Sequence, residues 1–223
     1  MKYVQYGCGI TAPVEWINFD ASPTILVERM PVLGKIIKGG KRLFPKNVRF
    51  GNILKGLPNI SPNSCDGVFC SHVLEHLSYE QCRTALAESY KILKPGGLFR
   101  CIVPDLERAA REYITTIENG KACGDSESLY TASFSFMQAT SLGVKRLPKN
   151  IFEKLRYMLG HSEHLWMWDE FSLRKELEMA GFENIRIAEF NDSGDPMFAL
   201  VEDAGRFDKS VAFESVKTGS WQR

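Results

Sequence analysis

Residues 66–104 read DGVFCSHVLEHLSYEQCRTALAESYKILKPGGLFRCIVP, and this stretch decides the fold. Its first six residues are an apolar-rich run that breaks into a loop at His72, which is typical of a buried strand in a parallel sheet. A helical segment and a second apolar-rich run, residues 98–103, follow at once. Such strand–helix–strand alternation predicts right-handed crossover units, which build a parallel sheet with helices on both faces.

The helical segment of this stretch carries its own start and stop signals. Ser78 and Gln81 have the spacing of a capping box, in which the serine accepts from a backbone N–H and the glutamine reaches back to the cap. Pro95 and the two glycines after it end the helix, because proline cannot continue the hydrogen-bond ladder. Between these signals an apolar stripe predicts the buried face: Cys82, Leu86, Tyr90 and Leu93.

The rest of the chain extends the same pattern. Residues 4–6, 16–19 and 48–50 are short strand candidates that precede the stretch, and Asp105 opens a helix after it. Asp169 opens another helix, which ends at Gly181. The last strand candidates, with a short turn between them, predict an antiparallel edge: residues 185–190, 197–201 and 211–216. We therefore expect an α/β fold, a Rossmann-like doubly wound and mostly parallel sheet with an antiparallel edge strand.

Composition and charge narrow the class of protein. The chain has 223 residues, of which 44% are hydrophobic and 25% charged, which is ordinary for one globular domain. A net charge of +1 gives no overall field that would attract nucleic acid or anionic lipid. No apolar run approaches the roughly 20 residues that span a bilayer, the first residues lack a signal-peptide core, and six cysteines without a CxxC pair favour reduced thiols. We expect a cytoplasmic single-domain protein over residues 1–223 with no nucleic-acid or membrane partner, and its oligomeric state stays open.

Two segments depart from the alternation, and we expect them to be insertions that cover the site: residues 24–50 and 119–168. In the first, seven basic residues face one acid, Glu28, which is typical of a solvated surface but also fits a basic rim for an anionic substrate. In the second, only residues 152–159 suggest a helix. Its end is either a hydrophobic plug over the sheet edge or part of an acceptor pocket, and it holds His161, His164, Trp166 and Trp168.

Polar residues and glycines follow each of the first four expected strands. A doubly wound sheet binds its ligand beyond the carboxyl ends of the strands, so these positions are expected to meet around one ligand. Glycine there lets the backbone approach a ligand, and Asp20 suits the two hydroxyls of a ribose, although aspartate also caps turns. The four strand-end groups are Gly7 with Cys8 and Gly9, then Asp20, then Asn52, and finally Ser71 with His72.

Four stretches together resemble the class I S-adenosylmethionine-dependent methyltransferases, and more narrowly the type 11 group of small bacterial methyltransferases. They are residues 4–9, residues 16–20, SHVLEHL at 71–77 and LKPGG at 93–97, and residues 164–182 add to the likeness. The resemblance implies the class I methyltransferase fold, a seven-stranded sheet with a reversed edge strand. It also implies S-adenosyl-L-methionine as the cofactor, bound across the strand ends.

The resemblance also implies roles for the strand-end residues. Gly7 to Gly9 would line the methionine and ribose, Asp20 would hold the ribose hydroxyls, and Ser71 would lie near the sulfonium. Asn52 would flank the adenine, and its amide oxygen can still accept from the adenine amine where relatives often carry aspartate. The expected cofactor-binding set is Tyr6, Gly7, Cys8, Gly9, Asp20, Ala21, Asn52, Ile53, Ser71 and His72.

His72 is the candidate catalytic residue, because a histidine near neutral pKa can take a proton from an oxygen acceptor. A role in shaping the cofactor site fits it equally. His72 and His76 stand one helical turn apart with Glu75 between them, which resembles a metal motif, but no third ligand is evident and we expect no metal. The sequence departs from the family at Gln5 and Thr11, and too few residues precede Asp20 for a full first helix.

These observations predict methyl transfer from S-adenosylmethionine to a small-molecule or carbohydrate acceptor, admitted through the two insertions. The alternative is a non-catalytic S-adenosylmethionine-binding or scaffold protein with the same fold, which the shortened first connection suggests. A nicotinamide-dependent oxidoreductase is disfavoured because no GxGxxG opens a helix after the first strand. A nucleic-acid methyltransferase is disfavoured because the basic stretch is local and lacks interleaved aromatic residues.

Overall fold

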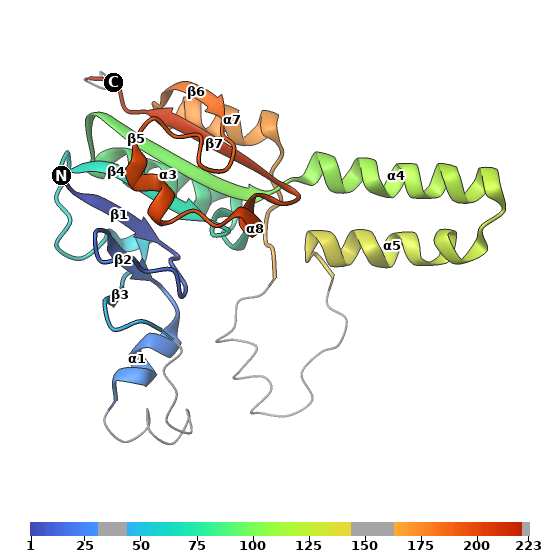
Figure 1. The fold of residues 1–223 in the computed structure, drawn as a ribbon, viewed down its shortest axis with the longest axis horizontal. Helices are drawn as coiled ribbons and strands as arrows, with labels where there is room; N and C mark the ends of the chain where they lie inside the picture. Colours follow the sequence, from blue (N-terminus) through green and yellow to red (C-terminus); the bar gives the residue numbers. More distant parts are fainter. Residues whose placement is uncertain (31–43, 144–162, 220–223) are drawn as a thin grey trace.

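The computed structural model describes residues 1–30, 44–143 and 163–219, and over these ranges the strands form one seven-stranded sheet (Figure 1). The strand order is β3-β2-β1-β4-β5-β7-β6, and β7 runs antiparallel to both of its neighbours. This is the Rossmann-like, mostly parallel sheet expected from the sequence, with its antiparallel pairing at one side. The strands are β1 (Tyr3–Tyr6), β2 (Ile17–Asp20), β3 (Val48–Phe50), β4 (Cys65–Ser71), β5 (Leu93–Pro104), β6 (Glu183–Ile187) and β7 (Ser210–Val216).

The pairing register brings the carboxyl ends of the first four strands to one edge. Tyr6 at the end of β1 pairs with Phe19 of β2 on one side and with Cys70 of β4 on the other. Asp20 pairs in turn with Phe50 at the end of β3. The residues that directly follow β1, β2, β3 and β4 are therefore neighbours in space.

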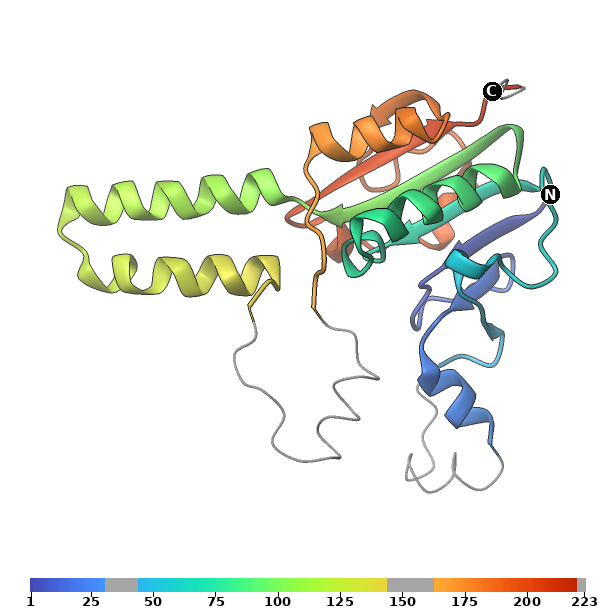
Figure 2. The ribbon, with the colours of Figure 1, turned by 180° about the vertical axis from the view of Figure 1, so that it is seen from behind.

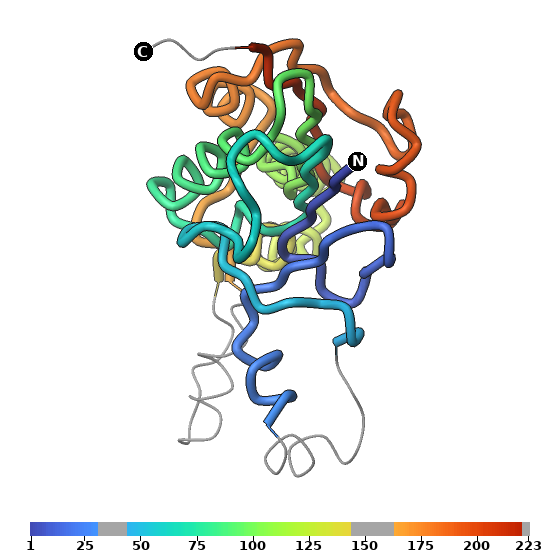
Figure 3. Tube along the Cα trace, turned by 90° about the vertical axis from the view of Figure 1, so that its left-hand side faces the viewer, coloured from blue at the N-terminus to red at the C-terminus, as the bar shows by residue number. Residues whose placement is uncertain are grey.

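Helices and a C-terminal segment cover opposite faces of the sheet (Figures 2 and 3). On one face lie α3 (Tyr79–Ile92) and α7 (Glu170–Met179), over a core that includes Leu86, Phe99 and Leu173. The capping box expected at the start of α3 is present, and Asp169 caps α7. The other face packs Trp16, Phe69 and Phe198, and the short helices η3 (Pro196–Leu200) and α8 (Ala204–Phe207) run along it. No helix connects β1 to β2, as the short spacing predicts.

A helical hairpin projects from the sheet beyond the end of β5 (Figure 1). Its first helix, α4 (Leu106–Cys123), begins at the Asp105 cap expected from the sequence. Its second, α5 (Ser126–Thr140), was not expected, because serine and glycine recur along that stretch and its apolar residues form no clear stripe. Part of the hairpin surface is apolar, with Tyr130 and Phe134 exposed.

Two local predictions were wrong. The strand expected over residues 197–201 is replaced by the 3-10 helix η3, Pro196–Leu200, because Asp195 caps it and Pro196, which lacks an N–H, begins it. Leu93 belongs to β5 and not to the helix, since α3 ends at Ile92 before the Pro-Gly-Gly turn. The helix expected over 152–159, His161 and the basic residues between 31 and 43 lie outside the described residues. The short helices α1 (Pro23–Arg29), η1 (Ile53–Lys55) and η2 (Leu74–His76) complete the elements described.

A buried ion network holds the C-terminal segment against the sheet. Arg100 of β5 is 1% exposed and contacts Glu202, Glu214 and Asp192 at 2.5, 2.9 and 3.0 Å. It also donates to the backbone carbonyl of Glu189. The network therefore joins β5 and β7 to the segment that carries η3.

Among the helices in the described part of the chain, none is long and apolar enough to cross a membrane.

Candidate functional site

The loop after β1 is shaped by two glycines with different surroundings. Gly7 (φ +67°) lies so close to Val73 that an added Cβ would be 2.1 Å from the Val73 Cγ2 methyl. Gly9 (φ +53°) has no atom of the described residues within 4 Å of its Cβ position, so among these residues its backbone borders open space. The first glycine thus allows the loop to pack on the segment after β4, and the second leaves room above the loop.

The Asp20 carboxylate binds this loop at the end of β2. Its Oδ2 accepts from the Gly9 N–H at 3.0 Å, and its Oδ1 accepts from the Ser22 N–H at 2.8 Å. The Gly51 N–H donates to the Asp20 carbonyl at 3.1 Å, which holds the end of β3 beside it. A carboxylate has about four lone-pair directions, so Asp20 can accept two more hydrogen bonds from a ligand.

Several of the expected cofactor residues turn their side chains into the core. The Tyr6 hydroxyl lies 3.0 Å from the Ser89 hydroxyl and is fully buried. Cys8 packs with Ile25 and Val48, and burial raises the pKa of its thiol to about 12. Ile53 is buried against the main core as well. These three positions can contact a ligand only through their backbone.

Asn52 and Ser71 differ in what their side chains do. The Asn52 Oδ1 accepts from the Leu54 N–H at 2.9 Å and caps η1, so its NH₂ group is the part available to a ligand. The Ser71 Oγ at the end of β4 is buried and has no hydrogen-bond partner among the described residues. A buried hydroxyl without a partner is costly, and at this strand end it marks a place where a bound group can complete the bonding.

His72 is held from two sides in a left-handed backbone conformation, with φ +54°. Its Nε2 lies 3.0 Å from the Arg206 carbonyl oxygen, to which it donates. Its Nδ1 lies 3.3 Å from Oε1 of Glu75. Burial lowers the pKa of His72, but the contacts with Glu75 and the Arg206 carbonyl outweigh burial and leave it raised. The position of Arg206 beside the end of β4 could not be read from the sequence.

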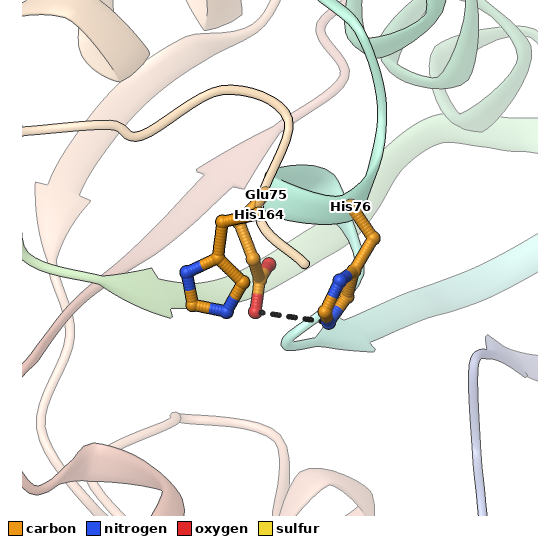
Figure 4. Close-up of side chains that lie close together, drawn as sticks. All are labelled: Glu75, His76 and His164. Carbon is orange, nitrogen blue, oxygen red and sulfur yellow. Dashed lines mark ion pairs between the residues drawn. The ribbon is translucent and has the colours of Figure 1, made fainter. Parts of the chain in front are cut away.

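A second group of side chains lies directly after His72, and the sequence did not predict it. Glu75 is fully buried, and its carboxylate oxygens have no hydrogen-bond partner in the part of the chain that the structure describes. His76 and His164 each place a ring nitrogen beside this carboxylate (Figure 4). The N–H groups of Leu165 and Trp166 donate to the Glu75 carbonyl at 2.7 and 3.2 Å, which fixes the segment that carries His164.

The aromatic residues after His164 divide between core and surface. Trp168 is 1% exposed and belongs to the main core, whereas Trp166 is half-exposed beside Tyr79, with ring centroids 5.1 Å apart. Burial is the larger influence on His164 and lowers its pKa, so its ring is neutral at physiological pH.

The strand ends offer the kinds of groups that the sequence predicts around S-adenosylmethionine. The backbone of Gly9, the accepting capacity of Asp20 and the Ser71 hydroxyl lie at neighbouring strand ends. Gly7, Asn52 and the backbone of Cys8 complete the same edge. When bound, this cofactor supplies a methyl group already activated on a sulfonium, so the protein has to orient the partners and exclude water.

Comparison with known proteins agrees with this geometry. Residues 4–101 match the family model described as a methyltransferase domain. An S-adenosylmethionine-dependent methyltransferase from Archaeoglobus fulgidus is 16% identical, with a TM-score of 0.50 over 97% of this chain and 86% of that one. A possible histamine N-methyltransferase from Thermotoga maritima is 18% identical, with a TM-score of 0.51 over 97% and 82%. Sequence comparison with curated proteins gives no match.

The fold and the matched family define the class of this protein. The seven-stranded sheet with its reversed strand is shared with S-adenosylmethionine-dependent methyltransferases. Residues 4–101, which run from β1 to most of β5 and hold all four strand ends, match a methyltransferase domain. On this fold, the match indicates an enzyme that transfers a methyl group from S-adenosylmethionine.

Proposed function

We propose that this enzyme transfers the methyl group to a small molecule or a sugar, and that the strand-end residues hold the cofactor as the sequence predicts. Gly7, Cys8 and Gly9 line the methionine and ribose through their backbone. Asp20 accepts from the ribose hydroxyls, while Ala21, Asn52 and Ile53 flank the adenine. The single observation that supports this assignment most is the open space over Gly9 next to the Asp20 carboxylate.

We assign His72 a positioning role in this site rather than that of a general base. Both of its ring nitrogens already face acceptors, the Arg206 carbonyl and the Glu75 carboxylate. With Nε2 bound to a carbonyl oxygen and Nδ1 turned toward a carboxylate, neither ring nitrogen is placed to take a proton from an acceptor. Its contacts instead fix the backbone after Ser71, where the sulfonium is expected.

The acceptor is proposed to enter between the two insertions. The first, residues 24–50, leaves the sheet at the end of β2 and returns at β3, and α1 begins from the Ser22 cap directly after Asp20. The second, residues 119–168, begins in the last turns of α4 and ends at the segment hydrogen-bonded to Glu75. The described ends of both insertions therefore lie at the strand-end edge. In this proposal, residues 1–223 form one domain.

Calorimetric titration with S-adenosylmethionine tests the cofactor assignment. We expect saturable binding by the wild type and at least about tenfold weaker binding by Asp20→Ala, because the ribose hydroxyls lose their acceptor. Asp208→Ala, which removes an exposed carboxylate, is the matched control and should bind as the wild type does. Unchanged affinity in Asp20→Ala would refute the ribose contact, and no binding by the wild type at millimolar ligand would refute the site.

The acceptor class needs a separate experiment. Incubation with methyl-labelled cofactor and separate pools of sugars, small phenols and amines, protein, and RNA should label a pool of small molecules. Labelling of only the protein or RNA pool would contradict the proposed acceptor class while leaving the cofactor site intact.

A further inference from the structure

We propose that Glu75, His76 and His164 form a binding site for a divalent transition-metal cation at the carboxyl end of β4. Each residue offers one ligand atom, and these three atoms all lie within 4.8 Å of one another (Figure 4). His76 and Glu75 belong to η2, and His164 comes from the segment before α7. The third ligand that the sequence lacks is thus supplied from a distant part of the chain.

The hydrogen bond of His76 orients its second ring nitrogen toward the proposed site. The Nδ1 of His76 lies 2.9 Å from the Glu163 carbonyl, to which only an N–H can donate. In the neutral ring, Nε2 then carries the lone pair, and it faces Glu75. In His164, Nδ1 lies 3.2 Å from the Met167 sulfur, and Nε2 is the nitrogen that faces the carboxylate. Outer contacts of this kind orient metal-binding histidines in known sites.

The Glu75 carboxylate has room for a cation on the side away from His72. Glu75 is fully buried, and within the described ranges its oxygens have no hydrogen-bond partner; His72 lies on one side at ion-pairing distance. On the other side the Nε2 of His76 is 3.9 Å from Oε1, too far for a hydrogen bond. A metal ion that lies between Glu75 and the two histidines would bind all three groups.

The donor set selects the class of ion. Two imidazole nitrogens and one carboxylate oxygen suit Zn²⁺, Co²⁺ or Mn²⁺, whereas Ca²⁺ and Mg²⁺ prefer all-oxygen sites. Three protein ligands leave at least one coordination position open. The hydrogen bonds from Leu165 and Trp166 to the Glu75 carbonyl hold the two halves of the site together.

The open coordination position would let the ion bind the hydroxyl of the acceptor. This role rests on the proposed function. The site follows Ser71 and His72 directly, so it lies beside the place proposed for the methyl donor. A hydroxyl of the acceptor that binds the ion loses its proton to water more easily. Its oxygen forms the new bond to the methyl carbon, while the carbon–sulfur bond breaks and its electron pair stays on sulfur.

Titration of the metal-free full chain with Co²⁺, followed by calorimetry and by visible absorption, tests the site. The wild type should bind one ion per chain with micromolar or tighter affinity and should show ligand-field absorption. Glu75→Gln and His164→Ala should each bind at least about tenfold more weakly, and circular dichroism checks that both are folded. Glu80→Gln removes an exposed acid nearby on α3 and should bind as the wild type does.

Thermal unfolding gives a second readout. Zn²⁺ should raise the melting temperature of the wild type and of Glu80→Gln, but not that of the two site variants, because only the native site binds the ion. No saturable binding by the wild type up to about 1 mM Co²⁺ would overturn the proposal. Equal binding by the wild type and both site variants would overturn it too, since the ion would then lie elsewhere.

Titration with S-adenosylmethionine distinguishes failure of the metal site from failure of the cofactor site. It is repeated in the presence of a chelator, where the strand-end site should still bind S-adenosylmethionine. Cofactor binding without any metal binding would refute the metal site alone. Metal binding without cofactor binding would uphold the metal site and refute the assignment of the strand-end residues.

Discussion

Replacing Gly9 by alanine separates the role of the first loop in stability from its role in binding. The backbone at Gly9 has φ +53°, and an alanine in that region costs about 1 kcal/mol. Since nothing lies within 4 Å of the new Cβ, no clash adds to this cost. We therefore expect urea unfolding to report a loss of about 1 kcal/mol in Gly9→Ala, which leaves the enzyme folded.

The loss of cofactor affinity should be larger than this change in stability explains. A methyl group at position 9 occupies the space proposed for the cofactor, so calorimetry should report at least about tenfold weaker binding of S-adenosylmethionine, or about 1.4 kcal/mol. Gly124→Ala is the matched control, because Gly124 has φ +67° and open space but lies at the tip of the hairpin. It should lose similar stability and no affinity. Affinity within twofold of the wild type in Gly9→Ala would refute the reasoning.

Three further predictions concern stability and thiol reactivity. Arg100→Met should lower the free energy of unfolding by about 3–5 kcal/mol in urea, because the buried Glu202 loses its ion pair and Glu214 is left with Arg186. Arg108→Met, which breaks an exposed pair, should cost less than about 1 kcal/mol. Burial raises the pKa of Asp192, but its ion pairs outweigh burial and lower the pKa to about 2. The stability that these ion pairs provide is therefore lost as the pH falls from about 4 to about 2. Over that pH range, urea unfolding should show that the wild type loses about 1–2 kcal/mol more stability than Asp192→Asn does. With a thiol reagent at neutral pH, Cys123 should react fast and the five buried cysteines only after unfolding, and fast reaction of more than one thiol would contradict the core packing.

The parts of the fold that the sequence predicts are those with local causes. Ser78 and Gln81 form their capping box within one helical turn, and Asp105 caps the helix after β5. The strand ends are likewise visible, because parallel strands with short apolar runs bring Gly9 and Asp20 together wherever the rest of the chain lies. In contrast, residues 197–201 carry the apolar composition of a strand. Their preference for a 3-10 helix follows from Pro196 and from packing on the far face of the sheet.

At the strand ends, the sequence predicts the position of the backbone but not the direction of the side chains. The sequence places Tyr6 and Cys8 at the site because of their position in the chain, and the backbone does reach it. Whether a side chain points to a ligand or to the core depends on which face of the sheet it occupies, and both of these point into the core. For His72 the decisive contact is the Arg206 carbonyl, which comes from the last part of the chain.

The metal proposal depends on the kind of contact that spacing does not reveal. The separation of His72 and His76 suggests a metal motif, but the neighbouring sequence offers no third ligand. The third ligand, His164, is brought in by two backbone N–H groups that bind the Glu75 carbonyl, a contact between segments separated by about two fifths of the chain. The same glutamate therefore fixes that segment through its backbone and faces the two histidines through its side chain. Among the described residues this buried carboxylate has the His72 ion pair and no hydrogen bond, and a bound cation would offset the cost of burying it at the edge of this site.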